Sequence, residues 1–112
     1  MEISIFKELV NKRFDECSTL MLGPKDAEYS RGGDKLYNFK RAALLENITP
    51  EKALLGMWTK HLISIIDIIN EIDQKIPSKE MLDEKINDNL NYLFLLEGLI
   101  KDFAAHVGRC SL

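Results

Sequence analysis

Apolar residues recur along most of the chain at intervals of three and four positions, which is the spacing of one face of an α-helix. Between about Ser4 and Met21 the recurring apolar residues are Phe6, Leu9, Val10, Phe14, Cys17 and Met21. Gly23 and Pro24 follow, and proline cannot continue a helix interior. The pattern therefore predicts a first helix over residues 4–21 with one apolar face.

A shorter helical pattern follows a segment rich in glycine and charge. Asp34 is expected to cap the N-terminus of this second helix, which ends near Asn47. Its expected inward residues are Leu36, Phe39, Ala43 and Leu44. Residues 23–33 are then the loop between the first and second helices of a single helical domain, residues 1–112.

Two longer helices are predicted in the second half of the chain. Thr49 is a suitable N-cap for the third, because Pro50 then takes the first helical position, where its missing N–H costs nothing. This helix is expected to reach Asp73. Ser78 caps a fourth helix, which is expected to last to about Phe103. Helical periodicity throughout predicts an all-α fold, bundle-like, with long third and fourth helices.

The third and fourth helices carry more apolar residues than one contact face needs. Those of the third are Leu62, Ile63, Ile65, Ile66, Ile68, Ile69 and Ile72, and those of the fourth are Leu90, Leu93, Phe94, Leu95, Leu96, Leu99 and Ile100. Apolar area of this extent usually marks an interface when it is exposed. We therefore expect a homo-oligomer that assembles through these two helices.

Composition excludes several classes of protein. The 112 residues contain 15 Lys and Arg against 18 Asp and Glu, a net charge of −3, so general DNA binding is not expected. The longest apolar stretch, residues 62–69, is interrupted by Ser64 and Asp67 and is shorter than the ~20 residues of a membrane span. The first residues do not resemble a secretion signal, and a cytoplasmic location is expected.

The two cysteines do not indicate a metal site. Cys17 and Cys110 lie far apart, and neither belongs to a C-x-x-C motif. A zinc site needs several Cys or His ligands at short spacing, and a disulfide framework needs several cysteines, so neither is expected. Cys17 lies on the apolar stripe of the first helix, where a thiol behaves as a small apolar group.

Polar residues line one side of each long helix. On the third helix they are Lys60, Ser64, Asp67 and Glu71, with His61 at the flank, and on the fourth they are Glu84, Asp88 and Asn91. Steps of three and four residues keep each set on one line. The two stripes either face solvent or face each other across the helix pair, and the pattern alone does not decide between these arrangements.

The segment 25–41 contains five basic and three acidic residues, a local charge of +2. A basic, glycine-containing segment that leads into a helix can bind phosphate through backbone N–H groups and basic side chains. Gly32 and Gly33 are equally consistent with a flexible turn. No serine or cysteine is spaced with histidine and acid as a catalytic triad would require.

A set of short motifs lies in residues 29–69 and 83–100, about two thirds of the chain. They are Tyr29-Ser30, Asn38-Phe39-Lys40, Thr49-Pro50-Glu51, Lys60-His61 with Ser64 and Asp67, and Asp83-Glu84-Lys85 with Asp88 and Asn91-Tyr92. In these motifs the chain resembles a family of small phage-encoded helical proteins, which are distantly similar to the MazG-like nucleotide pyrophosphatases.

The resemblance implies an enzyme superfamily that holds Mg²⁺ with an E-x-x-E pair on one helix and an E-x-x-D pair on the next, and cleaves nucleoside triphosphates. This chain departs from that pattern. The third helix offers Lys60, Ser64 and Asp67, and on the fourth Glu84 and Asp88 are four residues apart. A lysine at this place repels a metal ion and attracts phosphate, which favours binding over hydrolysis.

Three functional hypotheses follow. The first is a phage nucleotide-binding protein that sequesters a linear or cyclic nucleotide signal of host immunity without a cofactor, in the cytoplasm of the infected cell. Its candidate binding residues are Tyr29, Arg31, Asn38, Lys40, Trp58, Lys60, His61, Ser64 and Asp67. In this hypothesis the basic residues contact phosphate, and Tyr29 or Trp58 stacks on the base.

The second hypothesis is a Mg²⁺-dependent, MazG-like pyrophosphatase with Asp67, Glu84 and Asp88 as metal ligands. The third is a helical protein-interaction module whose polar stripes form ion pairs between helices, such as Lys60 with Glu84 or Asp88.

Overall fold

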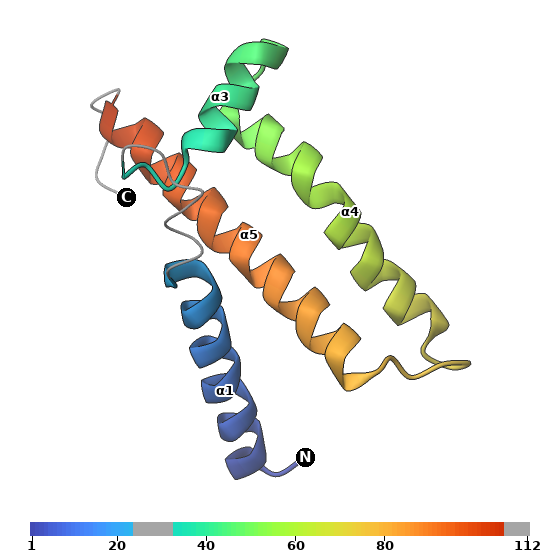
Figure 1. Cartoon of the computed structure of the whole chain (residues 1–112). Helices are drawn as coiled ribbons and strands as arrows, with labels where there is room; N and C mark the ends of the chain where they lie inside the picture. Colours follow the sequence, from blue (N-terminus) through green and yellow to red (C-terminus); the bar gives the residue numbers. More distant parts are fainter. Residues whose placement is uncertain (24–32, 107–112) are drawn as a thin grey trace.

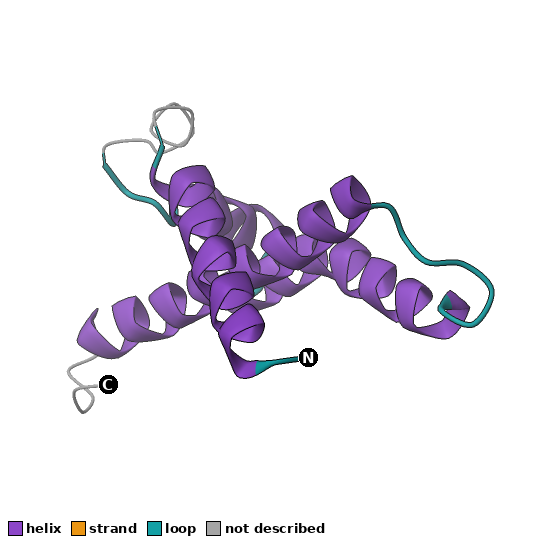
Figure 2. Cartoon of the chain, turned by 90° about the horizontal axis from the view of Figure 1, so that it is seen from below, coloured by secondary structure: helices purple, strands orange, loops and turns teal. Residues whose placement is uncertain are grey.

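The structure is a computed structural model that describes residues 1–23 and 33–106, and this part of the chain is helical with no strand (Figure 2). The four helices are α1 (Ile3–Leu22), α3 (Tyr37–Glu46), α4 (Pro50–Glu71) and α5 (Lys79–His106). α4 and α5, 22 and 28 residues long, form an antiparallel hairpin. α1 lies along α5 away from α4, and α3 crosses near the C-terminal end of α5 (Figure 1). The predicted all-α fold is confirmed, and the predicted long third and fourth helices are α4 and α5.

The two long helices begin at the caps that the sequence indicates. Thr49 Oγ1 accepts a hydrogen bond from the N–H of Lys52 at 3.2 Å, and Pro50 takes the first helical position. Ser78 Oγ accepts from the N–H of Met81 at 3.1 Å. α4 ends two residues earlier than expected, and α5 continues three residues further. Local capping chemistry thus sets the starts of these helices closely.

Asp34 is not the N-cap of α3, which corrects the prediction. Its Oδ1 accepts from the N–H of Leu36 at 2.9 Å, and its backbone oxygen accepts from the N–H of Tyr37 at 3.3 Å. A carboxylate that binds an N–H two residues on forms an Asx turn, so the helix starts only at Tyr37. At the other end, Asn47 has a left-handed conformation (φ 56°) and donates its N–H to Ala43 O, so the expected end is confirmed.

The apolar core lies between α3, α4 and α5. Phe39, Leu54 and Leu99 are buried at its centre, with Leu54 only 1% exposed. The partly buried residues packed around them are Leu36, Tyr92, Leu95 and Leu96. Leu44 was expected to point inward but is 76% exposed, because α3 buries the face that carries Phe39 and Ala43.

α1 is held on α5 by a polar cluster rather than by an apolar core. Arg13 donates to Asp83 Oδ1 at 2.7 Å, to Asp83 O at 3.2 Å and to Asn87 Oδ1 at 2.9 Å. The Nδ2 group of the buried Asn87 donates to Glu16 Oε2 at 3.3 Å. The Cys17 thiol donates to Asn87 Oδ1 at 3.4 Å, and burial raises the pKa of Cys17. The expected burial of Cys17 is confirmed.

The apolar stripe of α1 is covered only in part. Cys17 is buried, whereas Phe6, Leu9 and Phe14 remain about half exposed. α1 contacts α5 but neither α3 nor α4, so no described helix covers the rest of the stripe. Cys110 lies outside the described residues.

Candidate functional site

A cavity of about 250 Å³ lies between the C-terminal end of α1 and the α4–α5 pair. Four parts of the chain line it: α1, the segment before α3, α4 and α5. The lining residues are Leu20, Met21, Lys35, His61, Asp88, Asn91, Tyr92 and Leu95. Convergence of polar groups from separate elements is typical of ligand sites, so we take this polar cavity as the candidate functional site.

Two buried polar atoms of the polar cavity have no hydrogen-bond partner among the described residues. They are His61 Nδ1 and Asn91 Oδ1. His61 Nδ1 lies 3.3 Å from Asp88 Oδ2, but the two groups are not aligned for a hydrogen bond. Asn87, one turn before Asn91, has both amide atoms bonded to α1. Buried polar atoms nearly always have partners, so these two atoms are unusual, and both belong to residues that line the polar cavity.

Aromatic rings form one wall of the site. The Tyr92 ring stacks on Trp58 with centroids 5.9 Å apart, and it lies 5.3 Å from the His61 ring at a tilt of 34°. Trp58 Nε1 donates to Asn89 Oδ1 at 2.8 Å. Asn89 Nδ2 donates to the backbone oxygens of His61 at 3.2 Å and Lys85 at 2.7 Å. This amide therefore fixes the register of α4 on α5 and the position of the aromatic wall.

Both signs of charge line the cavity. Lys35 Nζ donates to Met21 O at 3.1 Å, at the C-terminal end of α1, where a cation is favoured by the helix dipole. Asp88 lies on the α5 side beside His61. Burial raises the pKa of Tyr92, and the charge of Asp88 adds to this effect, so the phenol stays neutral at ordinary pH. The site thus offers a cation, an anion and neutral groups within one small volume.

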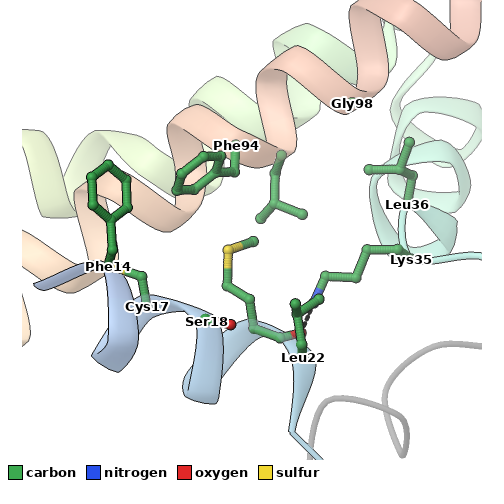
Figure 3. Close-up of a pocket in the computed structure, with 10 residues that line it drawn as sticks. Phe14, Cys17, Ser18, Leu22, Lys35, Leu36, Phe94 and Gly98 are labelled. Carbon is green, nitrogen blue, oxygen red and sulfur yellow. Dashed lines mark hydrogen bonds between the residues drawn. The ribbon is translucent and has the colours of Figure 1, made fainter. Parts of the chain in front are cut away.

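A second cavity of about 410 Å³ lies between α1 and α5 and is almost entirely apolar. Phe14 and Leu22 of α1, Phe94 of α5 and Leu36 point toward it (Figure 3). It shares Met21, Lys35 and Leu95 with the polar cavity. Without convergent polar groups, it offers volume for an apolar group but little basis for orienting a ligand.

The polar stripe predicted on α4 lies largely outside the site. Lys60 and Asp67 are exposed, and Ser64 Oγ donates to the backbone oxygen of Lys60 at 3.1 Å. Glu71, at the end of the same line, is also exposed. Of the residues predicted on this helix, His61 lines the cavity, and Trp58 contributes through its stack on Tyr92.

The candidates on α3 lie elsewhere. Asn38 is exposed. Lys40 Nζ donates to Asp34 Oδ2 at 2.9 Å and lies 2.7 Å from Asp102 Oδ2. These partners, Asp102 first, raise the pKa of Lys40, and the interactions tie α3 to α5. The remaining candidates, Tyr29 and Arg31, lie outside the described residues.

The acids of the magnesium hypothesis do not converge. Among residues 1–23 and 33–106, no group of three or more His, Cys, Asp and Glu side chains is placed to hold a metal ion. Glu84 is exposed and lies 3.9 Å from Lys85 Nζ, whereas Asp88 faces His61 and Asp67 is exposed on α4.

The ion pair proposed for the interaction-module hypothesis does not form either. None of the ion pairs between described residues joins Lys60 to Glu84 or to Asp88. Asp88 instead meets His61, which is the neighbour of Lys60 in the chain but faces α5.

Apart from His61 and Trp58, the residues of the site were not among the predicted nucleotide-binding residues. Asn89 and Lys35 illustrate why. Asn89 is the amide that connects α4 and α5, and an amide inside the apolar fourth helix was the available signal, since such groups need internal partners when they pack inward. Lys35 has no comparable signal. Its place in the site depends on how the segment before α3 meets the end of α1.

No protein family, curated protein or solved structure matches the chain. None of the helices in the described part of the chain is both long and apolar enough to cross a membrane.

Proposed function

We propose that the chain is a nucleotide-binding protein of the phage-encoded kind that its sequence resembles. The polar cavity takes the base of a linear or cyclic nucleotide. The observation that carries this proposal is the pair of buried, unpartnered atoms, His61 Nδ1 and Asn91 Oδ1, in one cavity. The edge of a nucleobase carries N–H donors and ring nitrogens at short spacing, which is the chemistry these atoms need.

The charges suggest how the ligand is oriented. Asp88 beside His61 repels phosphate and favours an amino group of the base. Lys35 at the end of α1 is the cation of the cavity wall, so we place the phosphate groups on its side. Tyr92 offers an aromatic surface to the base. The volume of about 250 Å³ is small for a ligand pocket, and the phosphates would extend to solvent.

Sequestration is favoured over hydrolysis. Magnesium-assisted attack on a phosphate needs carboxylates that converge on the metal, and Asp67, Glu84 and Asp88 do not converge. A protein that binds a nucleotide without consuming it lowers the free concentration of that nucleotide. In the cytoplasm of an infected cell, such a protein would blunt a nucleotide signal of host immunity.

We also propose that the chain works as a homo-oligomer. The chain exposes 8,609 Å², whereas a compact monomer of 12.9 kDa exposes about 6,300 Å². Its radius of gyration is 16.5 Å, against about 13 Å expected for this length. Self-association covers apolar side chains that are otherwise left in water.

Calorimetric titration with a panel of linear and cyclic nucleotides tests the ligand proposal. The informative variant is Asn91→Leu, which keeps the side-chain size and removes the unpartnered oxygen. We expect it to weaken binding at least roughly tenfold while leaving the melting temperature unchanged or higher, because an unsatisfied buried group is removed.

Asn11→Leu, at an exposed position of α1, is the matched control and should bind as the wild type does. A wild-type chain that binds no nucleotide of the panel overturns the proposal. Release of pyrophosphate from nucleoside triphosphates and Mg²⁺, lost in Asp88→Asn, would instead establish the pyrophosphatase.

A further inference from the structure

The α4–α5 hairpin has an apolar side that no other helix in the described part of the chain covers, and we call this side the open face. On α4, Leu55, Leu62 and Ile69 recur every seven residues, and Ile66 lies between the last two. On α5, Ile86, Leu93 and Ile100 also recur every seven residues, with Leu82 one turn earlier. Leu55, Ile66, Ile69, Leu93 and Ile100 are each about half exposed or more, and the spacing is that of a helix packing seam.

The open faces of the two helices point to the same side of the hairpin. At 100° per residue, the open residues of α4 lie about a quarter turn from its core residue Leu54. Those of α5 lie about 40° to 80° from Leu96, a partly buried residue that packs against the core, and they are turned in the same sense. Because the helices are antiparallel, rotations in the same sense bring both sets to one side. The hairpin thus presents one continuous apolar surface.

The polar cavity lies on the opposite side of α5. Asp88, Asn91 and Leu95 follow one another at steps of three and four and line the cavity. On the same helical wheel they lie roughly half a turn away from Ile86 and Leu93. A molecule that packs on the open face therefore leaves the entrance of the cavity uncovered.

The area and the shape favour a second copy of the chain as the occupant. The whole chain exposes about 2,300 Å² more than a compact monomer of its mass does, which is ample for the ~800 Å² per partner that a stable interface buries. Two antiparallel helices with one apolar face are half of a four-helix bundle, and a second identical layer completes it. A two-fold axis lets the same patch serve both copies.

The centre of the open face also suits a copy of itself. The eight residues that define it on α4 and α5 are uncharged. Glu97 borders it, four residues after Leu93 and three before Ile100. Glu97 is paired with Lys101 at 3.6 Å, so no unpaired charge is buried when two copies meet. Membrane-binding helices usually border their apolar face with many basic residues, and this chain has a net charge of −3.

We propose that two copies of the chain pack open face to open face, forming a four-helix layer of two α4–α5 hairpins with a polar cavity on each outer side. The inference rests on the self-association proposed above and specifies its surface and stoichiometry. It requires neither that the cavity binds a nucleotide nor that the ligand is present.

Light scattering on the full-length chain at micromolar concentration, with and without open-face variants, tests the proposal. We expect the wild type to have twice the 12.9 kDa mass of one chain. Ile66→Glu and Leu93→Glu, one on each helix, should each give a monomer with unchanged helical circular dichroism. Leu45→Glu is the control, because Leu45 is 76% exposed on α3 and outside the open face, and this variant should remain a dimer.

If a glutamate variant fails to fold, the milder variants Ile66→Ala and Leu93→Ala replace it in the test. Each should weaken dimerisation at least roughly tenfold. A monomeric wild type overturns the proposal. Binding of that monomer to anionic vesicles or to another protein would assign the open face to a different partner and would not rescue the proposal. A dimer that withstands changes on both helices overturns the choice of surface. Nucleotide titration of the monomeric variants keeps the two proposals separate, because their cavities remain intact.

Discussion

The chain joins its helices in two different ways. Between α3, α4 and α5 the contact is an apolar core, in which Phe39, Leu54 and Leu99 are buried together. Between α1 and α5 the buried contact is a cluster of hydrogen bonds around Arg13 and Asn87. Beside this cluster lies the apolar cavity of about 410 Å³ rather than packed side chains. The core thus depends on packed volume, and the α1 contact depends on charge and geometry.

This difference has consequences for how the molecule opens. Elements with few buried apolar contacts open locally at a lower free energy than the core does. α1 is therefore the helix expected to separate first, and its end forms part of the polar cavity through Leu20 and Met21. If the polar cavity binds a nucleotide as proposed, separation of α1 from α5 would also open the site through these residues.

The largest effect is expected from a change in the core. Leu54→Ala removes the most buried large side chain of the described core and leaves a cavity, which costs about 2–5 kcal/mol of the free energy of unfolding. Urea unfolding, followed by Trp58 fluorescence at a fixed chain concentration, measures this loss. Leu45→Ala, at an exposed site on α3, is the control and should change the value by less than about 0.5 kcal/mol.

Features that depend on neighbouring residues were predictable from the sequence. The starts of α4 and α5 follow from Thr49, Pro50 and Ser78, because a capping bond spans only three residues. Asp34 shows the limit of such reasoning. An aspartate that caps a helix and one that forms an Asx turn both accept an N–H bond close by, so residue type alone does not choose between them.

Pairings across the fold were not predictable in the same way. His61 was predicted at the flank of the polar stripe of one helix and Asp88 on the polar stripe of the next. Their approach to 3.3 Å depends on the rotation of α4 against α5. Arg13 and Asp83, 70 residues apart, belong to helices whose contact no local pattern specifies. The sequence therefore predicted the site only in part, through His61. The other residues of the site could be identified only from the tertiary structure.

A smaller effect, confined to α1, is expected for Arg13→Ala. The change removes the guanidinium that α1 donates to Asp83 and to the buried Asn87. Asp83 then keeps only its bond from Lys79, which lies on α5 itself, and Asn87 Oδ1 keeps only the Cys17 thiol. Amide hydrogens of α1 should then exchange at least roughly tenfold faster, while those at the centre of α4 keep their protection.

Hydrogen exchange followed by mass spectrometry, resolved by peptide, measures this contrast. Lys12→Ala is the matched control, because Lys12 is a neighbouring, more exposed base that lies 4.0 Å from Glu16. Equal loss of protection in α1 and α4 would show that α1 belongs to the core after all, and the distinction between the two regions would fail.

The smallest effect concerns pH. Hydrogen bonds from Lys79 and then Arg13 lower the pKa of Asp83 from 3.8 to about 2. A lowered pKa means that the folded state binds the proton less readily than the unfolded chain does. The stabilisation is therefore fully present above about pH 4 and is lost as the pH falls toward 2. Arg13 also donates to the backbone oxygen of Asp83, and protonation of the carboxylate does not remove this bond. Protonation should therefore loosen α1 less than Arg13→Ala does.

The difference in stability between the wild type and Asp83→Asn isolates this carboxylate from the others that titrate in the same range. We expect the wild type to be more stable above pH 4 and the difference to shrink steadily between pH 4 and 2. In an Arg13→Ala background the same difference should be smaller throughout, since one of the two cations is gone. A difference that is independent of pH, or unaffected by Arg13, would mean that charge does not hold α1 on α5.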